Sequence, residues 1–343
     1  MNDELNALHV NNTWIITDLP QGKKPIGCKR VYKIKYQANG DIERYKARLV
    51  AKGYTQVEGI DFFETYSPVA KLTTVRLIIA ISSSQNWHLH QLDVHNAFLH
   101  GDLEEEVYMS VPPGLTSSKS NQVCKLIKSL YGLKQSSKQW FFKLSHALIL
   151  KGYKQSVSDP SLFIKNNTAS FTALLVYVDD LILAGNDIEE ITGIKEFLHN
   201  KIKIKDLGYL KYFLGLEISR SQSGIHVCQR KYALDVLVDT GLLASKPAAT
   251  PMQRGTKLSQ KLGTPLADPV SYRRLIGKLI YLTNTRPDIS YSVQQLSQLM
   301  NTPTNLHYES SIRVLRYIKS SPALGLFFPS NSHLQLKGFC DSD

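Results

Sequence analysis

The sequence predicts a mixed α+β fold in which antiparallel β-hairpins pack against helices. Runs of alternating hydrophobic and polar residues flank Ala38–Asp41, and an Asn-Gly step between such runs is a strong hairpin signal. Hydrophobic residues at helical spacing predict a helix from Ser136 to Lys151, which Gly152 would end. These residues are Trp140, Phe141, Leu144 and Leu148. A chain of 343 residues is long enough for roughly two domains.

Further strands and helices are expected along the rest of the chain. Thr73 and Thr74 can cap a buried helix, VRLIIAI, which the strand WHLHQLDV follows. Two apolar runs separated by Asp179-Asp180 predict a second hairpin, and a helix should follow from about Ile188 to Asn200. YFLGLEI and IHVCQ predict a third hairpin, and YALDVLVDTGLL a helix. Residues 245–270, rich in Pro, Lys, Gly and Ser, are interpreted as a linker to a mostly helical region.

The composition is that of a folded, basic protein. Hydrophobic residues make up 43% and charged residues 20%, and Lys plus Arg exceed Asp plus Glu by 41 to 29. Within residues 23–52 ten basic side chains stand against only Asp41 and Glu43, so the predicted hairpin is a surface for phosphate groups. The ten are Lys23, Lys24, Lys29, Arg30, Lys33, Lys35, Arg44, Lys46, Arg48 and Lys52.

Cysteine usage and the N-terminus argue against secretion. The four cysteines lie far apart and form neither a CxxC pair nor a disulfide framework, which favours free thiols in a reducing compartment. MNDELNALHV has no signal-peptide pattern, and no apolar run approaches the length of a membrane span. We therefore expect an intracellular protein without a membrane partner.

The aspartate pair Asp179-Asp180 interrupts two almost wholly apolar strands. Carboxylates beside core strands lose hydration and repel each other, so a cation should compensate them. Mg²⁺ prefers oxygen ligands, and two such ions about 3.5 to 4 Å apart are the usual device for phosphoryl transfer. Asp93 ends another apolar strand and would complete the site if the two strands are neighbours. The alternative is a simple Asx turn, but the long apolar arms and the second acidic strand end favour a metal site.

Several motifs together resemble the reverse transcriptases of copia-type retrotransposons. YVDD at 177–180 resembles the catalytic YxDD box, QLDVHNAFLHGDLEEEVYM the first catalytic-aspartate motif, and LYGLKQ at 130–135 the template and nucleotide motif. ERYKARLVAKGYTQ, GIDFFETYSPVAK and YFLGLEI are also similar to that family and stand in its order. The similarity extends from about Leu8 to the C-terminus.

The resemblance implies a right-hand polymerase whose antiparallel palm sheet packs on helices. Fingers, palm and thumb would occupy 1–244, followed by the linker 245–270, a mostly helical connection region at 271–335 and the start of a ribonuclease H domain at 336–343. In that last segment Asp341 would be the first catalytic carboxylate. Ribonuclease H needs several carboxylates around paired metals, so we expect no such activity from this chain.

The implied activity is RNA-directed DNA synthesis in the cytoplasm, in a virus-like particle, or in the nucleus. Asp93, Asp179 and Asp180 would bind two Mg²⁺ ions, and the primer 3′-hydroxyl would attack a deoxynucleoside triphosphate with loss of pyrophosphate. The implied partners are a primed RNA or DNA template and deoxynucleoside triphosphates. The oligomeric state stays open.

The resemblance also implies roles for residues around the acids. Tyr177 and Val178 would lie beside the primer terminus. Phe98, five residues after Asp93, stands where reverse transcriptases place an aromatic gate against the ribose 2′-hydroxyl, although a core phenylalanine is an equal alternative. Tyr131 and Gly132 would frame the incoming nucleotide, or else form only a turn before the next helix.

Other residues would contact the triphosphate and the primer. Lys46 and Arg48 are the candidates for gripping the triphosphate, and which of them does so is left open, as is a merely solvated basic face. Lys205 would protonate the leaving pyrophosphate. The segment Phe213–Ile218 resembles the primer grip, and its residues that would contact the primer are Phe213, Leu214 and Gly215.

Departures from the family pattern keep a second hypothesis open. Arg30 stands where the family usually has Trp, and Ser136-Ser137-Lys138 where it usually has Ala-Pro-Arg. The chain is therefore either an active polymerase or an inactive retrotransposon remnant that binds nucleic acid. Phe98 and YVDD disfavour an RNA-dependent RNA polymerase. A zinc site is disfavoured for His88, His90, His95 and His100, since no cysteine lies near them in sequence.

Overall fold

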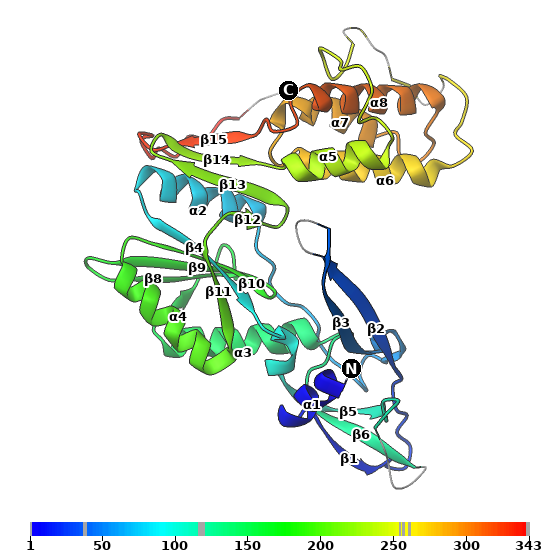
Figure 1. The fold of residues 1–343 in the computed structure, drawn as a ribbon, viewed down its shortest axis with the longest axis vertical. Coiled ribbons are helices and arrows are strands. Elements are labelled where there is room, and N and C mark those ends of the chain that lie inside the picture. The colour runs from blue at the N-terminus through cyan, green and yellow to red at the C-terminus, as the bar shows by residue number, and fades with distance from the viewer. Residues whose placement is uncertain are drawn as a thin grey trace. The chain divides into compact units, whose positions relative to one another are not determined.

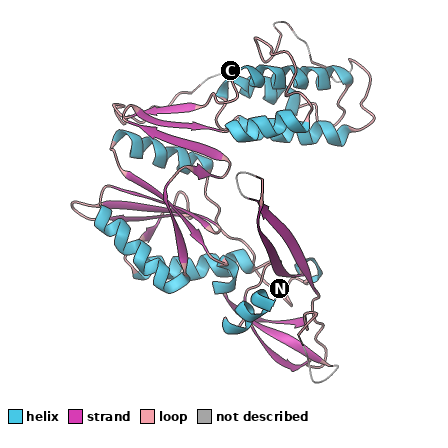
Figure 2. Ribbon diagram, viewed as in Figure 1, coloured by secondary structure: helices cyan, strands magenta, loops and turns pink. Residues whose placement is uncertain are grey.

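The computed structural model describes residues 2–36, 40–115, 121–253, 255, 258–259 and 262–340. The chain folds into two compact units (Figure 1). Unit 1 consists of Met1–Val75 and His88–Gly208, and unit 2 of Arg76–Trp87 and Tyr209–Asp343. Helices and antiparallel sheets alternate in both units (Figure 2), which confirms the mixed α+β class.

A six-stranded sheet organises unit 1, with strand order β11-β4-β10-β9-β8-β7. Its strands are β4 (His88–Val94), β7 (Lys154–Gln155), β8 (Leu162–Asn166), β9 (Phe171–Tyr177), β10 (Asp180–Gly185) and β11 (Ile204–Tyr209). Helices α3 (Ser136–Leu150) and α4 (Ile188–Ile202) agree closely with the predicted helices. Buried residues of β4, β9 and β10 form one hydrophobic core with both helices, so these helices cover one face of the sheet.

Helix α4 begins at a side-chain cap, and α3 follows the hydrophobic spacing of its sequence. The Asp187 side chain accepts the backbone N–H groups of Glu189 and Glu190 and so caps α4, whose first turn is acidic. Helix α3 buries Trp140, Leu144 and Leu148 at the helical spacing seen in the sequence.

The remainder of unit 1 is a smaller sheet, a two-stranded ribbon and one helix. The sheet has the order β1-β6-β5, with β1 (Trp14–Asp18), β5 (Asp102–Ser110) and β6 (Gln122–Lys128). The ribbon pairs β2 (Cys28–Tyr36) with β3 (Ile42–Ala51), as the alternating runs predicted. Residues 37–39 of its turn lie outside the described residues. Helix α1 (Asn2–Val10) contributes Leu8 to the hydrophobic core that this region shares with β3, β5 and β6.

Unit 2 combines a four-stranded sheet with a helical cluster. The sheet has the order β12-β13-β14-β15, and α2, which starts in unit 1, runs on into unit 2. The strands are β12 (Tyr212–Phe213), β13 (Leu216–Ser221), β14 (Gly224–Cys228) and β15 (Leu326–Pro329). The helices are α2 (Leu72–Ser84), α5 (Arg230–Asp239), α6 (Pro269–Leu282), α7 (Ser290–Ser297) and α8 (Asn305–Ser320). Helices α5, α6, α7 and α8 share one buried core.

The two compact units are a division by packing, separate from the polymerase regions expected from the sequence. Unit 2 starts again at Tyr209, whereas we expected one region to extend to residue 244. Described residues of the expected linker are bonded within unit 2, since the N–H of Ala248 donates to Arg316 and that of Leu266 to Pro303. The assignment of fingers, palm, thumb and connection regions stays a prediction. Asp341 lies outside the described residues.

A buried carboxylate, Asp159, ties the start of α2 to the strand β8. Its side chain is 4% exposed and accepts hydrogen bonds from the Lys71 N–H, the Thr74 hydroxyl and the Ser161 N–H and hydroxyl. Burial alone would raise the pKa of Asp159, but the bonds from Ser161 and Thr74 hold it below the ordinary value of 3.8. The ionised form is therefore the one that the fold stabilises.

We predict that Asp159→Asn lowers the free energy of unfolding by about 1–3 kcal/mol at pH 7, because buried donors lose their acceptor. Since the folded pKa of Asp159 is depressed, its contribution is present above the ordinary value of 3.8 and is lost as the pH falls through the folded value. Urea unfolding of both proteins at pH 7 and near pH 3 measures the difference. An equal difference at both pH values would contradict this account.

Candidate active site

Asp93 and Asp180 lie directly opposite each other on adjacent strands. Strands β4 and β10 are antiparallel, and in their register Asp180 is the partner of Asp93. Asp179 precedes Asp180, and its carbonyl oxygen accepts the backbone N–H of Val94 at 2.8 Å. The prediction that these strands are neighbours is therefore confirmed, and three acidic residues from two distant segments meet at the same end of the sheet.

The Asp93 and Asp180 side chains lie on the sheet face that α3 and α4 leave uncovered. Successive side chains of a strand point to opposite faces. Leu92, Val94 and Leu181 belong to the core beneath the two helices, so Asp93 and Asp180 point away from that core. On that face Asp93 and Asp180 are partly exposed, whereas Ile182 and Leu175 further along the strands are buried.

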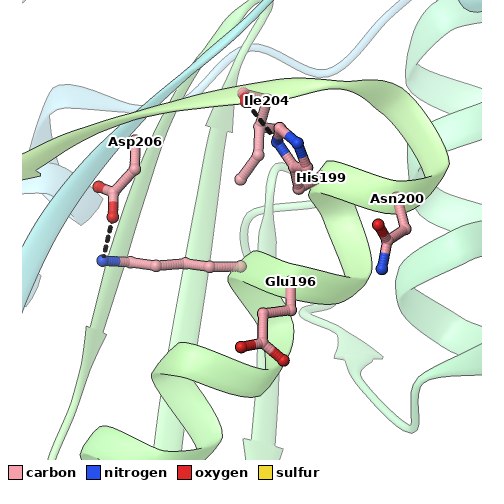
Figure 3. A pocket seen from close by; sticks show the side chains of 6 residues that line it. Glu196, His199, Asn200, Ile204 and Asp206 are labelled. Carbon is pink, nitrogen blue, oxygen red and sulfur yellow. Dashed lines mark hydrogen bonds and ion pairs between the residues drawn. The ribbon is translucent and has the colours of Figure 1, made fainter.

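A cavity of about 290 Å³ lies on the opposite, helix-covered side of the sheet (Figure 3). There the Asp206 carboxylate of β11 points toward α4 and forms an ion pair with Lys195 at 2.8 Å. His199 of α4 is bonded to the Ile204 carbonyl oxygen. Because strand side chains alternate, the neighbour of Asp206, Lys205, points to the face that carries Asp93.

The turn that carries Asp179 has an unusual backbone and a specific support. Tyr177 and Asp180 are register partners, so Val178 and Asp179 form a two-residue turn between β9 and β10. Val178 has a φ of 54°, which a β-branched residue rarely adopts. The indole N–H of Trp140, from α3, donates to the Val178 carbonyl oxygen at 2.7 Å. Trp140 is only 1% exposed, so a rigid helix holds the turn.

The electrostatics of the acids favour a bound cation. Burial raises the pKa of Asp93 and of Asp180, and the charge of Asp179 raises both further. His95, Lys205 and Lys46 offset part of the rise at Asp93, and a hydrogen bond from Gln91 does so at Asp180. The negative charge of the cluster is thus only partly compensated by the protein.

The donor set suits a hard divalent cation, since all three side chains supply carboxylate oxygens. As the side chains lie, however, no group of three His, Cys, Asp or Glu residues in the described parts of the chain is arranged to hold a metal ion. The strand register thus brings the three acids to one place, and closing them around an ion requires their side chains to adjust.

Two basic candidates come from one face of the β2–β3 ribbon. Lys46 is the register partner of Lys33 and Arg48 that of Val31, so both cations point to the same side. Burial, and then the charge of Arg48, lower the pKa of Lys46. The charge of Lys46 in turn acts on Asp93, which places this face toward the acids.

Tyr131 connects the ribbon to Phe98. The Arg48 guanidinium carbon lies 4.3 Å from the centre of the Tyr131 ring, and the Phe98 ring meets Tyr131 edge-on at a centroid distance of 5.0 Å. Burial raises the pKa of Tyr131, Arg48 lowers it, and Asp179 and Asp93 raise it further. Lys46, Arg48, Tyr131 and Lys205 thus act on or contact the surroundings of the acids, while Phe98, which contacts Tyr131, also packs against the hydrophobic core of the large sheet. The roles expected for these residues stay predictions.

Gly132 is required where the 130–135 turn meets the ribbon. Its φ is +95°, and an added Cβ would lie 2.2 Å from the Ala51 carbonyl oxygen. The Ala51 N–H donates to the Tyr131 carbonyl oxygen at 2.7 Å, which docks the turn on the end of β3. Residues 130–135 thus form a turn before α3, and their expected contact with the nucleotide stays a prediction.

Three of the five expected primer contacts, Phe213, Leu214 and Gly215, belong to unit 2, whereas Tyr177, Val178 and the acids belong to unit 1. Leu214 and Gly215, with φ values of 48° and 74°, form the turn between β12 and β13. The Tyr281 hydroxyl donates to the Leu214 carbonyl oxygen. Phe213 is 1% exposed, whereas Leu214 and Gly215 of the adjoining turn are partly exposed, and the primer contacts expected for all three stay predictions.

Sequence reasoning did not find the role of Trp140 or of Gln91. Trp140 was expected only as one hydrophobic residue of a helix face, and Gln91 only as part of a motif. Trp140 contacts the Val178–Asp179 turn from a helix that ends well before it in the sequence, and Gln91 donates to Asp180 on the adjacent strand at 3.4 Å. No local sequence signal marks such contacts.

We predict that Asp180→Asn raises the free energy of unfolding at pH 7 in the absence of divalent cations, because it removes a half-buried charge repelled by Asp179. The folded pKa of Asp180 is raised above 3.8, so the unsubstituted protein loses stability as the pH rises through the folded value. The gain should therefore shrink when urea unfolding is repeated below about pH 4.

The exposed Asp102, which is paired with Lys143, offers a matched control. Asp102→Asn should leave stability unchanged or slightly lower, since surface ion pairs contribute about 0–1 kcal/mol. A loss of stability in Asp180→Asn at pH 7 would show that the aspartates are not in mutual repulsion.

Comparison with known proteins agrees with this geometry. A family model described as reverse transcriptase (RNA-dependent DNA polymerase) matches residues 11–254. The Retrovirus-related Pol polyprotein from transposon RE1 of Arabidopsis thaliana is 44% identical over 345 residues, covering 100% of this chain and 24% of the relative. That from transposon TNT 1-94 of Nicotiana tabacum is 38% identical over 354 residues, with 100% and 27% covered.

A shorter relative extends the comparison to fungi. A transposon Ty5-1 protein of Saccharomyces cerevisiae is 31% identical over 254 residues, covering 73% of this chain and 82% of that protein. The chain spans about a quarter of the length of the plant polyproteins that it matches. Within the described residues, no helix is both long and apolar enough to cross a membrane. The chain belongs to the reverse transcriptase (RNA-dependent DNA polymerase) family, in the form found in copia-type retrotransposon Pol polyproteins.

Proposed function

We propose that this chain is an RNA-directed DNA polymerase in which Asp93, Asp179 and Asp180 hold two Mg²⁺ ions. The observation that carries the proposal is the register of β4 and β10, which sets Asp93 opposite Asp180 with Asp179 in the adjoining turn. The raised pKa values of Asp93 and Asp180 support it, because burial and the charge of Asp179 disfavour their ionised forms and a bound cation would favour them.

When bound, the two ions would lower the pKa of the primer 3′-hydroxyl and balance the charge of the triphosphate. The residues of the chain would bind and orient the reactants. Lys46 and Arg48 face the acids from β3 and would hold the triphosphate. Lys205, on the Asp93 face of β11, would give a proton to the leaving pyrophosphate.

Other residues would select and position the substrates. The Phe98 ring would stand under the sugar and exclude a 2′-hydroxyl, so deoxynucleoside triphosphates are the proposed substrates. Tyr177 and Val178, next to the acids in the hairpin, would contact the end of the primer. Leu214 and Gly215 are proposed as further primer-binding residues. The proposed partner is a primed RNA or DNA template inside the cell.

Binding without catalysis is the alternative, and the β2–β3 ribbon favours the binding part of it. Val31, Lys33 and Lys35 face Arg48, Lys46 and Arg44 in the register, so five cations share one face of the ribbon. Such a face attracts phosphate groups whether or not the acids are active. Primer extension on an RNA template with Mg²⁺ and deoxynucleotides separates the two possibilities, and its failure with the folded, unsubstituted chain would reject the polymerase.

We predict that Asp179→Asn lowers primer extension by at least about 10²-fold while the affinity for primer–template stays within about twofold, because the acid acts in chemistry and not in binding. Extension on a primed RNA template and a separate binding titration measure the two effects. Asp102→Asn, an exposed acid ion-paired with Lys143, serves as the matched control and should keep its activity. Full activity in Asp179→Asn would eliminate the proposed ligand set.

We predict that Trp140→Phe lowers kcat about tenfold and leaves the KM for deoxynucleotide nearly unchanged, since the phenyl ring fills the site but cannot donate to Val178. The turn that carries Asp179 would then lose its support from α3. Trp14→Phe, a tryptophan packed in the smaller core of unit 1, is the control. Equal losses in both variants, or a loss only in stability, would argue against a role in positioning the turn.

A further inference from the structure

We propose that Tyr131 is a positioning residue whose ring couples Arg48, on the triphosphate side, to Phe98, on the sugar side. One aromatic ring would then influence both the affinity for the nucleotide and the discrimination against ribonucleotides. This inference rests on the proposed polymerase function and adds a residue that determines its specificity.

Two contacts of different kinds hold the Tyr131 ring. Arg48 lies over the ring at 4.3 Å from its centre, where the negative face of the aromatic system attracts a cation. Phe98 meets the same ring at 5.0 Å with an interplanar angle of 72°, which is the favoured edge-to-face geometry. Arg48 belongs to β3, and Phe98 to the short 3₁₀ helix Ala97–His100 that follows β4. The ring therefore joins the basic ribbon to the segment that follows Asp93.

The backbone leaves Tyr131 little freedom to move away from Arg48. Its carbonyl oxygen accepts the N–H of Ala51, three residues after Arg48 on the same strand. The next residue, Gly132, approaches Ala51 so closely that a Cβ would lie 2.2 Å from the carbonyl oxygen. The strand that carries the guanidinium and the turn that carries the ring are thus fastened together.

Arg48 itself retains unused capacity to bind an anion. In the described parts of the chain, its Nε atom is buried and has no hydrogen-bond partner. An unpaired buried donor is costly, and a phosphate oxygen would relieve that cost if the guanidinium turned its Nε atom toward the phosphate on binding. A planar guanidinium stacked on a ring also presents its remaining donors in a fixed fork, which suits phosphate better than a flexible ammonium group. This favours Arg48 over Lys46 as the residue that grips the triphosphate.

The Tyr131 hydroxyl plays no part in either contact. Burial raises the pKa of Tyr131, and the charges of Asp179 and Asp93 raise it further despite Arg48, so the side chain stays a neutral phenol at physiological pH. Tyr131→Phe should therefore preserve the coupling, whereas Tyr131→Leu should abolish it. This pair of variants distinguishes a role of the aromatic ring from a role of side-chain volume alone.

The experiment measures kcat/KM for insertion of a single deoxynucleotide, and of the matching ribonucleotide, on one primed RNA template. We expect Tyr131→Leu to raise the KM for the deoxynucleotide about three- to tenfold and to reduce discrimination against the ribonucleotide by a similar factor. Tyr131→Phe should stay within about twofold of the unsubstituted chain in both quantities. Arg48→Lys should cost affinity in the unsubstituted background but much less in Tyr131→Leu, because the ring that orients the guanidinium is already absent.

The outcomes distinguish this inference from the proposed function. If the unsubstituted chain extends a primer and Tyr131→Leu changes kcat alone, with discrimination unchanged, Tyr131 is merely a packing residue and the inference is wrong. Equal effects of Tyr131→Phe and Tyr131→Leu would also overturn it, since they would assign the role to the hydroxyl. If the unsubstituted chain extends no primer, the polymerase function fails and the inference fails with it. Urea unfolding of each variant identifies any that has not folded.

Discussion

The backbone pairing between β4 and β10 is the constraint on which the site depends. In an antiparallel pair, a slip of one residue turns every side chain of a strand to the other face of the sheet. With such a slip, Asp93 would lie beneath α3 and α4 in the place of a leucine or valine. The buried residues Leu92, Val94, Leu181 and Leu183 prevent it, because they must face the helices. The hydrophobic core thus decides where the acids stand.

Placing three carboxylates at one end of the sheet costs free energy, and neighbouring groups offset part of that cost. The charges of Lys205, on β11, and of Lys46, on the β2–β3 ribbon, lower the pKa of Asp93. Gln91 donates a hydrogen bond to Asp180. The compensation is partial, as the raised pKa values of Asp93 and Asp180 show. An arrangement that is unfavourable by itself and favourable with a cation is what a metal-dependent site requires.

Hydrogen bonds and close packing hold the turns that carry the site residues. The Trp140 indole donates a hydrogen bond to the Val178–Asp179 turn. Residues 130–135 dock on β3 through the Ala51 N–H and the close approach of Gly132. In the proposed polymerase, these supports would keep the three acids and the substrate-binding residues in fixed positions. The geometry of the site therefore depends on these supporting residues as well as on those that would touch the substrate.

The sequence by itself determined the mixed α+β class, the helices α3 and α4, the ribbon β2–β3 and the identity of the three acids, because these depend on periodicity, turn residues and local motifs. Only the tertiary structure decided the strand register that pairs Asp93 with Asp180, the support from Trp140, the burial of Phe213 and the contact of Arg48 with Tyr131. The division into two compact units, within α2 and at Tyr209, also came only from the tertiary structure. Such features arise from packing between segments far apart in the chain, for which no local pattern carries a signal.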